Sequence, residues 1–163
     1  MSETTTVTEV IIQKAEEDDA AAIAVLLRQL GWFTHFDTAS AQDTADRVGC
    51  HMALCNADDS HSIYVAKNRV GDLVGYASIH WLPYMFLTGI EGYLSELFVA
   101  EHYRGKAVGR LLLEHIKTEA KDRGCSRLML VTSRNRESYQ RGFYAKQGWR
   151  EREEVANFVC DLG

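Results

Sequence analysis

The segment of residues 90–123 constrains the fold more than any other part of the chain. Residues 90–99 (IEGYLSELFV) are rich in β-branched and aromatic side chains and predict a strand. Residues 109–123 repeat apolar side chains at helical spacing, and Gly124 follows as a helix C-cap. A short glycine-containing connection therefore joins a strand directly to an amphipathic helix, which is typical of a mixed α/β architecture.

The remaining segments predict further strands and helices along the chain. Strands are expected at residues 7–13, 62–67, 73–81, 127–132 and 158–162, and residues 150–155 could add one more before the last. Helices are expected at residues 16–31, 40–54 and 137–147. The continuous apolar character of residues 127–132 predicts a central strand buried on both faces. The fold class is α/β (α+β mixed), with helices packed on a central sheet.

Regular alternation along residues 90–99 would divide their side chains between the two faces of the sheet. Tyr93, Ser95, Leu97 and Val99 would lie on one face, and Leu94, Glu96 and Phe98 on the other. This division decides which side chains can reach a substrate on either face.

Length and composition fit a single domain of residues 1–163. The chain has 163 residues, of which 46% are hydrophobic and 25% charged, and no linker or repeat interrupts it. No apolar run approaches the roughly 20 residues that span a bilayer, and residues 1–9 lack the features of a signal peptide. We therefore expect a soluble, cytoplasmic protein without a membrane partner.

Charge and cysteine content argue against nucleic acid and metal as partners. The net charge of −5 gives little attraction to a phosphate backbone. The four cysteines are too scattered for a disulfide framework, and we expect them to be reduced. Cys50, His51, Cys55 and His61 fit no usual zinc spacing, so no metal is expected.

The connection between the strand and the helix carries the strongest chemical signal. Residues 103–110 read YRGKAVGR, with small side chains at positions 105, 107 and 109 and basic ones at 104, 106 and 110. Small residues let backbone N–H groups approach a ligand closely, and a helix N-terminus adds positive potential. The segment matches neither the dinucleotide-binding nor the Walker pattern. It predicts a cradle for a pyrophosphate group.

The same connection, with its neighbours, resembles the GNAT superfamily of acetyl-CoA-dependent N-acetyltransferases. Residues 94–99 and 104–113 resemble the family's motif A, residues 135–149 with the run FYAKQGW resemble motif B, and residues 12–32 resemble the first strand and helix. The resemblance implies a central, mostly antiparallel sheet with a splayed parallel pair, flanked by about four helices. It also implies acetyl-CoA as cosubstrate and transfer of the acetyl group to an amine.

The resemblance further implies which residues bind acetyl-CoA. The backbone at Leu97, Phe98 and Val99 would pair with the pantetheine arm as with an additional strand. Asn135 would touch the pantetheine. Ala107 stands where glycine is commonest in the family, and it fits there if its φ is negative. The residues expected to hold the pyrophosphate are Arg104, Gly105, Lys106, Ala107, Val108, Gly109 and Arg110.

Two side chains are candidates for the catalytic roles. Tyr144 matches the motif B tyrosine, whose hydroxyl can act as general acid toward the leaving sulfur; packing through its ring is the alternative. Glu96 could act as the base, directly or through a water molecule. Glu91, Tyr93, Ser95 and His80 compete for that role, and many relatives have no unique base.

Aromatic side chains in two connections could form the walls of the acceptor pocket. One group is Trp32, Phe33, His35 and Phe36, which could instead form a lid over the core, and the other is Trp81, Tyr84, Met85 and Phe86. Aromatic walls with acids nearby favour an amine with an apolar or cationic body, such as a polyamine, an aminoglycoside or an amino acid. A protein N-terminal or lysine acetyltransferase and a catalytically silent acyl-CoA-binding regulatory module remain alternatives. A homodimer through residues 149–160 is also open.

Overall fold

The computed structural model describes residues 9–163, which divide into two compact units, residues 9–129 and residues 130–163. Residues 1–8, which hold most of the segment examined for a signal peptide and the start of the first predicted strand, lie outside the described residues. Within residues 9–163, no helix is long and apolar enough to cross a membrane.

Five strands form one sheet with the order β1-β2-β3-β4-β5. They are β1 (Ile11–Lys14), β2 (His61–Lys67), β3 (Leu73–Leu82), β4 (Glu91–Val99) and β5 (Arg127–Leu130). The first four strands pair antiparallel, each with its neighbour in the order. Ser126 N donates to Ile90 O at 2.9 Å, and Leu128 follows beside Gly92, so β5 runs parallel to β4. The predicted mostly antiparallel sheet with one parallel pair is confirmed.

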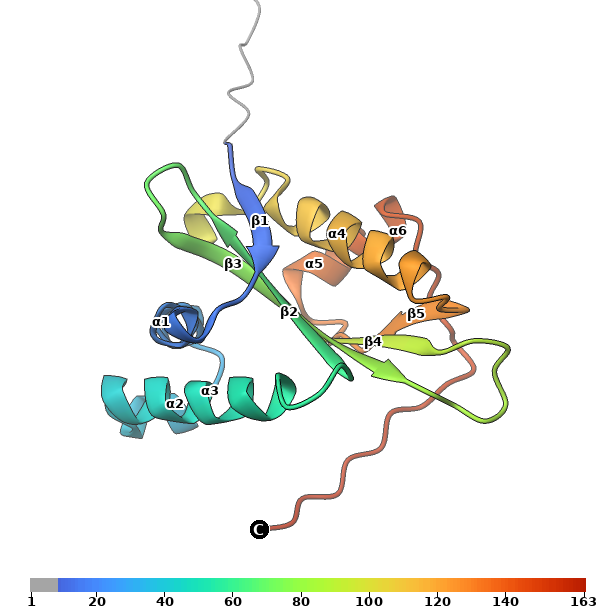
Figure 1. The fold of residues 1–163 in the computed structure, drawn as a ribbon, viewed down its shortest axis with the longest axis horizontal. Coiled ribbons are helices and arrows are strands. Elements are labelled where there is room, and N and C mark those ends of the chain that lie inside the picture. Colours follow the sequence, from blue (N-terminus) through green and yellow to red (C-terminus); the bar gives the residue numbers. More distant parts are fainter. Residues whose placement is uncertain (1–8) are drawn as a thin grey trace, which may run out of the picture. The chain divides into compact units, whose positions relative to one another are not determined.

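Helices cover both faces of this sheet (Figure 1). Helix α1 (Ala20–Leu30) and helix α3 (Ala41–Cys55) pack on one face, and α4 (Val108–Asp122) packs on the other. Gly31 ends α1 in the left-handed conformation at φ 66°, and the Ser40 hydroxyl accepts the Asp43 N–H at 3.0 Å to begin α3. These boundaries agree with the sequence-based ones because both helices carry strong cap residues.

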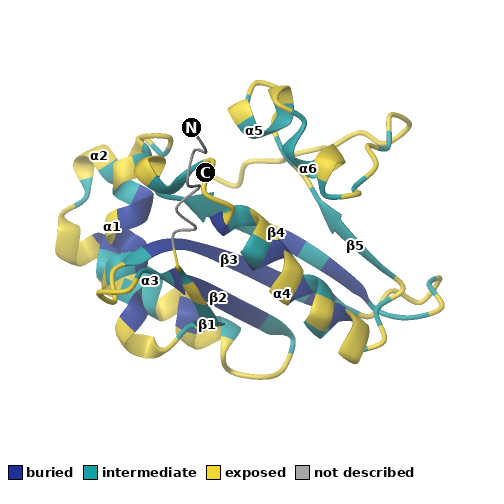
Figure 2. Cartoon of the chain, turned by 90° about the horizontal axis from the view of Figure 1, so that it is seen from above, coloured by how far each residue is buried: buried dark blue, intermediate teal, exposed yellow. Residues whose placement is uncertain are grey.

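The core on the α1 and α3 face is made of apolar side chains from four elements. Figure 2 shows β2 and β3 buried along most of their length, between helices whose outer faces are exposed. Contacts between these apolar side chains set the distance of α1 and α3 from the sheet. The cluster comprises Ile23, Leu26, Leu27, Met52, Ile63, Val65 and Tyr76.

A β-bulge at Ser95 breaks the regular alternation of β4. Glu96 is opposite Ser78, yet Leu94 is opposite Ile79, so β4 has one residue more than β3 at this point. The predicted alternation is therefore wrong beyond Ser95. Tyr93, Glu96 and Phe98 share the α1 and α3 face, whereas Leu94, Leu97 and Val99 share the α4 face.

On the α4 face, the Glu119 carboxylate joins the helix to the sheet. It accepts hydrogen bonds from Lys14, Ser62, Tyr64 and Arg123 at 2.7–3.0 Å. Burial raises the pKa of Glu119, but these four donors outweigh it and lower the pKa to about 2. The carboxylate is therefore ionised at neutral pH and holds α4 against β1 and β2.

Several other sequence-based boundaries differ from the structure. A short helix, α2 (His35–Thr38), interrupts the connection predicted to be irregular, and Glu17–Asp19 forms a 3₁₀ turn before α1. Strand β5 is shorter than residues 127–132, stands at the end of the strand order and is half-buried, so the prediction of a central strand buried on both faces is wrong.

The second unit contains two short helices, α5 (Glu137–Gln140) and α6 (Phe143–Lys146). Gly142, at φ 67°, separates them, so the single helix predicted at residues 137–147 is wrong. The strands predicted at residues 150–155 and 158–162 are also absent from the described chain, and Phe158 is 91% exposed. A strand needs a hydrogen-bonding neighbour, and this segment has none within residues 9–163. The homodimer through residues 149–160 stays a prediction.

Gly89 allows two turns of the first unit to approach closely, and its replacement by alanine should destabilise the protein. A Cβ atom there would lie 2.5 Å from the Gly124 carbonyl oxygen and 3.2 Å from the Ser126 nitrogen. We expect Gly89→Ala to lower the free energy of unfolding by about 1–3 kcal/mol in urea denaturation. Gly49→Ala is the matched control. Gly49 lies inside α3, and a Cβ atom there would meet only Ala20 Cβ, at 3.8 Å. This substitution should raise the free energy of unfolding by up to about 1 kcal/mol. Equal effects of the two substitutions would contradict this packing.

Candidate active site

The connection between β4 and α4 presents a row of free backbone N–H groups. The first helical hydrogen bond of α4 runs from Leu111 N to Ala107 O at 2.9 Å. Within residues 9–163, no acceptor takes the N–H groups of Gly105 and of residues 107–110. Four N–H groups at the start of a helix are ordinarily left without a partner and carry partial positive charge. The predicted cradle therefore has the donors that a phosphate oxygen requires.

Two residues of this connection have left-handed backbone conformations. Gly105 has φ 73° and Ala107 has φ 65°, the one non-glycine residue with a positive φ among residues 9–163. The expectation that Ala107 fits through a negative φ is wrong. The turn requires the left-handed conformation whichever residue occupies it, and the alanine Cβ adds about 1–2 kcal/mol of strain.

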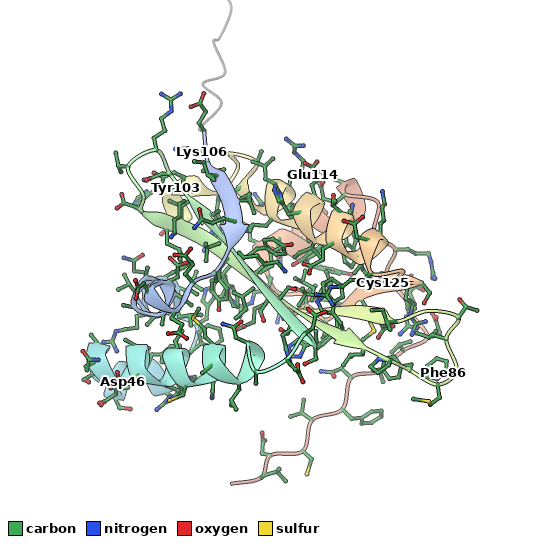
Figure 3. The ribbon with its side chains drawn as sticks, viewed as in Figure 1. Asp46, Phe86, Tyr103, Lys106, Glu114 and Cys125 are labelled. Carbon is green, nitrogen blue, oxygen red and sulfur yellow. The ribbon has the colours of Figure 1, made fainter. Side chains whose placement is uncertain are left out.

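The basic side chains of the connection are held by neighbours. Arg104 Nε donates to Val99 O at 3.3 Å, and its guanidinium lies 5.5 Å from the Trp32 ring centroid. Lys106 Nζ lies 5.2 Å from the Tyr103 ring, and Figure 3 shows these two side chains together beside the start of α4. Arg110 pairs with Glu114 at 2.7 Å. The charges are thus fixed near the free N–H groups.

Glu96 lies on the α1 and α3 face of the sheet, where burial raises the pKa of its carboxyl group. The Tyr76 hydroxyl donates to Glu96 Oε1 at 3.1 Å and, like the charge of His51, acts against this rise. A half-buried carboxylate with one fixed hydrogen bond is a suitable proton acceptor. Tyr76 was missed by the sequence analysis, because only the strand register brings it beside Glu96.

An aromatic cluster lies next to Glu96. The Phe98 ring contacts Trp32, Phe33 and Tyr76 with centroid distances of 5.7–5.9 Å. Phe33 and Phe36 also pack on the core, so these two residues form the predicted lid over its edge. Arg28 holds the segment in place by donating to the backbone oxygens of Phe36 and Ala39 and to Thr44 Oγ1.

The other carboxylate proposed as a base is not free to act. Glu91 is 1% exposed and pairs with Arg127, so its carboxylate serves the β4–β5 contact. Tyr93, Ser95 and His80 lie together at the bulge: His80 Nε2 and Ser95 Oγ are 2.9 Å apart, and the His80 and Tyr93 ring centroids are 6.0 Å apart.

The second predicted wall of the acceptor pocket is only partly supported. Trp81 is opposite Gly92 on the α4 face, where its Nε1 donates to Ser62 Oγ at 3.1 Å and Arg123 stacks on its ring at 4.8 Å. The assignment of Trp81 to the pocket is wrong, because its side chain lies on the opposite face of the sheet from Glu96. Met85 and Phe86 are exposed, and Phe86 lies at the tip of the β3–β4 loop (Figure 3).

Tyr144 and Asn135 belong to the second unit. Tyr144 is the second residue of α6, and its ring lies 5.0 Å from that of Phe143 and 6.3 Å from that of Trp149, centroid to centroid. Burial raises the pKa of the Tyr144 hydroxyl, so it is protonated at neutral pH. Asn135 is exposed, and its N–H donates to Ser133 Oγ at 3.3 Å. The role of Tyr144 as general acid and the contact of Asn135 with the pantetheine stay predictions.

The chain is an acyltransferase of mixed α/β fold, as its similarity to known acetyltransferases shows. The model of the acetyltransferase (GNAT) family matches residues 22–149. The chain belongs to this family, whose members transfer an acetyl group from acetyl-CoA to amines.

Three similar proteins illustrate the relationship. The aminoglycoside N(6')-acetyltransferase type 1 of Stenotrophomonas maltophilia is 29% identical over 158 residues, which cover 93% of each chain. The thialysine N-epsilon-acetyltransferase of Bos taurus is 26% identical over 75% of this chain and 74% of its own. A transcriptional regulator from Bacillus halodurans C-125 has the same fold, with a TM-score of 0.81, 20% identity and coverage of 93% and 100% of the two chains.

Ala107→Gly should stabilise the protein, because glycine adopts the left-handed conformation without the Cβ penalty. We expect the free energy of unfolding to rise by about 1 kcal/mol, measured by urea denaturation. Ala39→Gly serves as the control, since Ala39 has φ −83° and glycine there only adds entropy to the unfolded chain. The strain at position 107 would be refuted by Ala107→Gly and Ala39→Gly destabilising alike.

Proposed function

We propose that this enzyme transfers the acetyl group of acetyl-CoA to a primary amine of a small molecule by direct attack. The observation that carries the proposal is Glu96, a half-buried carboxylate with a raised pKa beside the Phe98 cluster. A carboxylate next to aromatic rings suits an amine with a cationic or apolar body. The two relatives named for aminoglycoside and thialysine substrates support a small acceptor of the aminoglycoside, polyamine or amino-acid class.

Acetyl-CoA binding in this proposal uses backbone groups more than side chains. The N–H groups of Gly105 and residues 107–110 receive the pyrophosphate, and Arg104, Lys106 and Arg110 supply charge. The pantetheine arm pairs with the backbone of Leu97, Phe98 and Val99, and Asn135 touches it. Arg104 must then share the Val99 carbonyl with the arm or release it, since its Nε donates there in the structure.

The chemistry requires proton acceptors near the amine and a proton donor near the sulfur. Glu96 removes a proton from the amine nitrogen, and Tyr144 gives a proton to the departing thiolate. The family match covers residues of both units, which supports a single N-acetyltransferase domain of residues 1–163. The proposed steps use only protein groups and the two substrates, so no metal takes part.

Two alternatives differ from this proposal in what they turn over. A protein N-terminal or lysine acetyltransferase would use the same cosubstrate but would acetylate peptides in preference to small amines. A silent acyl-CoA-binding regulatory module would bind acetyl-CoA and release no thiol. The retained tyrosine at position 144 favours turnover over the silent module.

The proposal predicts acetyl-CoA-dependent thiol release with aminoglycosides, polyamines or amino acids, at higher kcat/KM than with N-terminal or lysyl peptides. Tyr144→Phe should lower kcat by roughly 10²-fold with unchanged affinity for acetyl-CoA, because the ring remains and only the acidic hydroxyl is lost. Tyr139→Phe is the matched control: its hydroxyl contacts Glu151 at 2.8 Å and has no role in the reaction. Full activity of Tyr144→Phe in single-turnover measurements would make Tyr144 a packing residue.

Glu96→Gln should lower kcat/KM by roughly 10²-fold, since glutamine keeps the shape and the Tyr76 contact but cannot accept a proton. Its calorimetric affinity for acetyl-CoA should equal that of the parent. Glu137→Gln, at an exposed position of α5, should behave like the parent. A Glu96→Gln enzyme with parental kcat/KM would remove Glu96 from the mechanism.

A further inference from the structure

Polar side chains form a connected row from the β4 bulge to the loop that precedes β2. Ser95 Oγ lies 2.9 Å from His80 Nε2, and the His80 ring is 4.3 Å from the ring of His61, centroid to centroid. His61 Nδ1 lies 2.7 Å from Ser60 Oγ, and the Ser60 hydroxyl donates to the exposed carboxylate of Asp58. Ser95, at one end of the row, is exposed, and the two histidines contact each other through their rings.

The Ser95 hydroxyl can direct its single proton in two ways. Ser78 O lies 3.2 Å away and His80 Nε2 lies 2.9 Å away, and both can accept. When Ser95 donates to His80, the His80 Nε2 lone pair is engaged and its proton sits on Nδ1. In this arrangement, a proton arriving at Ser95 Oγ can displace the hydroxyl proton onto His80.

His80 is held in its neutral form. Burial lowers the pKa of His80, and the charge of His61 lowers it further. Because the Ser60 hydroxyl donates to Asp58, Ser60 Oγ accepts a hydrogen bond from His61 Nδ1. The titratable groups on the same face as His80 are His61 on β2 and Tyr93 and Glu96 on β4. Asp58 is connected to His61 through Ser60. The Glu91 carboxylate is paired with Arg127.

The acceptor nitrogen must lose two protons for each acetyl group transferred. An ammonium carries three protons on nitrogen and the product amide carries one; of the two released, one is balanced by the thiol of coenzyme A and one goes to solvent. Glu96 can hold one proton at a time. A second proton acceptor on the same face would let the ammonium become neutral before Glu96 acts.

We propose that Ser95 and His80 are this second acceptor, and that His80, which is half-buried, releases the proton to solvent. The inference rests on the proposed function and deepens it. The ammonium N–H bond breaks as the proton moves to Ser95 Oγ, and the Ser95 O–H bond breaks as its proton moves to His80 Nε2. The neutral amine then forms the C–N bond while Glu96 takes the second proton. Ser95 touches the substrate, whereas His80 acts through Ser95 as a positioning residue.

His80→Ala should lower kcat/KM by roughly 10- to 100-fold near pH 7, and added imidazole should restore part of the loss by serving as a diffusible base. Ser95→Ala should lower kcat/KM to a similar extent. His115→Ala on α4 is the matched control, because its Nδ1 contacts only the Leu111 carbonyl at 3.0 Å, and imidazole should not affect it. Acetyl-CoA affinity and the melting temperature, measured for each variant, separate the chemical effect from misfolding.

His61→Gln tests the relay without removing His80. It eliminates the charge that lowers the His80 pKa, so the His80 pKa should rise in an NMR titration, and the acid limb of kcat/KM should move to higher pH. An unmoved acid limb, or a His80→Ala enzyme that keeps full activity or gains nothing from imidazole, would overturn the relay. If the parent acetylates no amine, the proposed function fails instead, and an unchanged His80 titration in His61→Gln would still reject the coupling.

Discussion

One extra residue in β4, Ser95, determines which side chains meet on each face of the sheet. Without the bulge, Glu96 would share a face with Leu94, away from Tyr93 and His80. With it, Tyr93, Glu96 and Phe98 lie together on the face covered by α1 and α3, while Leu97 and Val99 face α4. The bulge thus places the candidate base beside the aromatic cluster and leaves Val99 to lead into the anion-binding connection.

The start of α4 depends on the same strand. Arg104 lies in the connection between β4 and α4, and its Nε donates to Val99 O. The same guanidinium lies over the Trp32 ring, so it links this connection to the aromatic cluster. Gly75 lets β3 lie close to β4 and to the start of α4, since a Cβ atom there would lie 2.9 Å from the Phe98 carbonyl oxygen and 3.3 Å from a Val108 methyl group. The left-handed Ala107 is the local cost of turning the chain into α4 with its N–H groups free.

The elements with strong caps and regular periodicity could be predicted from the sequence. The Ser40 and Gly31 caps and the apolar stripe of α4 act within one turn of helix, so the end of α1 and the bounds of α3 and α4 were predicted to within one residue. The composition of residues 104–110 predicted a cradle for a pyrophosphate group, and that role stays a prediction. The bulge at Ser95, the Tyr76–Glu96 contact and the place of Trp81 depend on cross-strand register, which no local pattern contains. The strand predicted at residues 158–162 failed because β-propensity does not supply a pairing partner.

The central claim is that the backbone N–H groups of Gly105 and residues 107–110 bind the pyrophosphate of acetyl-CoA. Amide NMR titration tests it most directly, because each N–H group reports its own hydrogen bond. The account predicts that acetyl-CoA produces its largest amide shifts at Gly105 and residues 107–110, whereas pantetheine, which lacks the pyrophosphate, leaves these amides unchanged. Saturable binding of acetyl-CoA with no shift at these residues, or equal shifts from pantetheine, would contradict it.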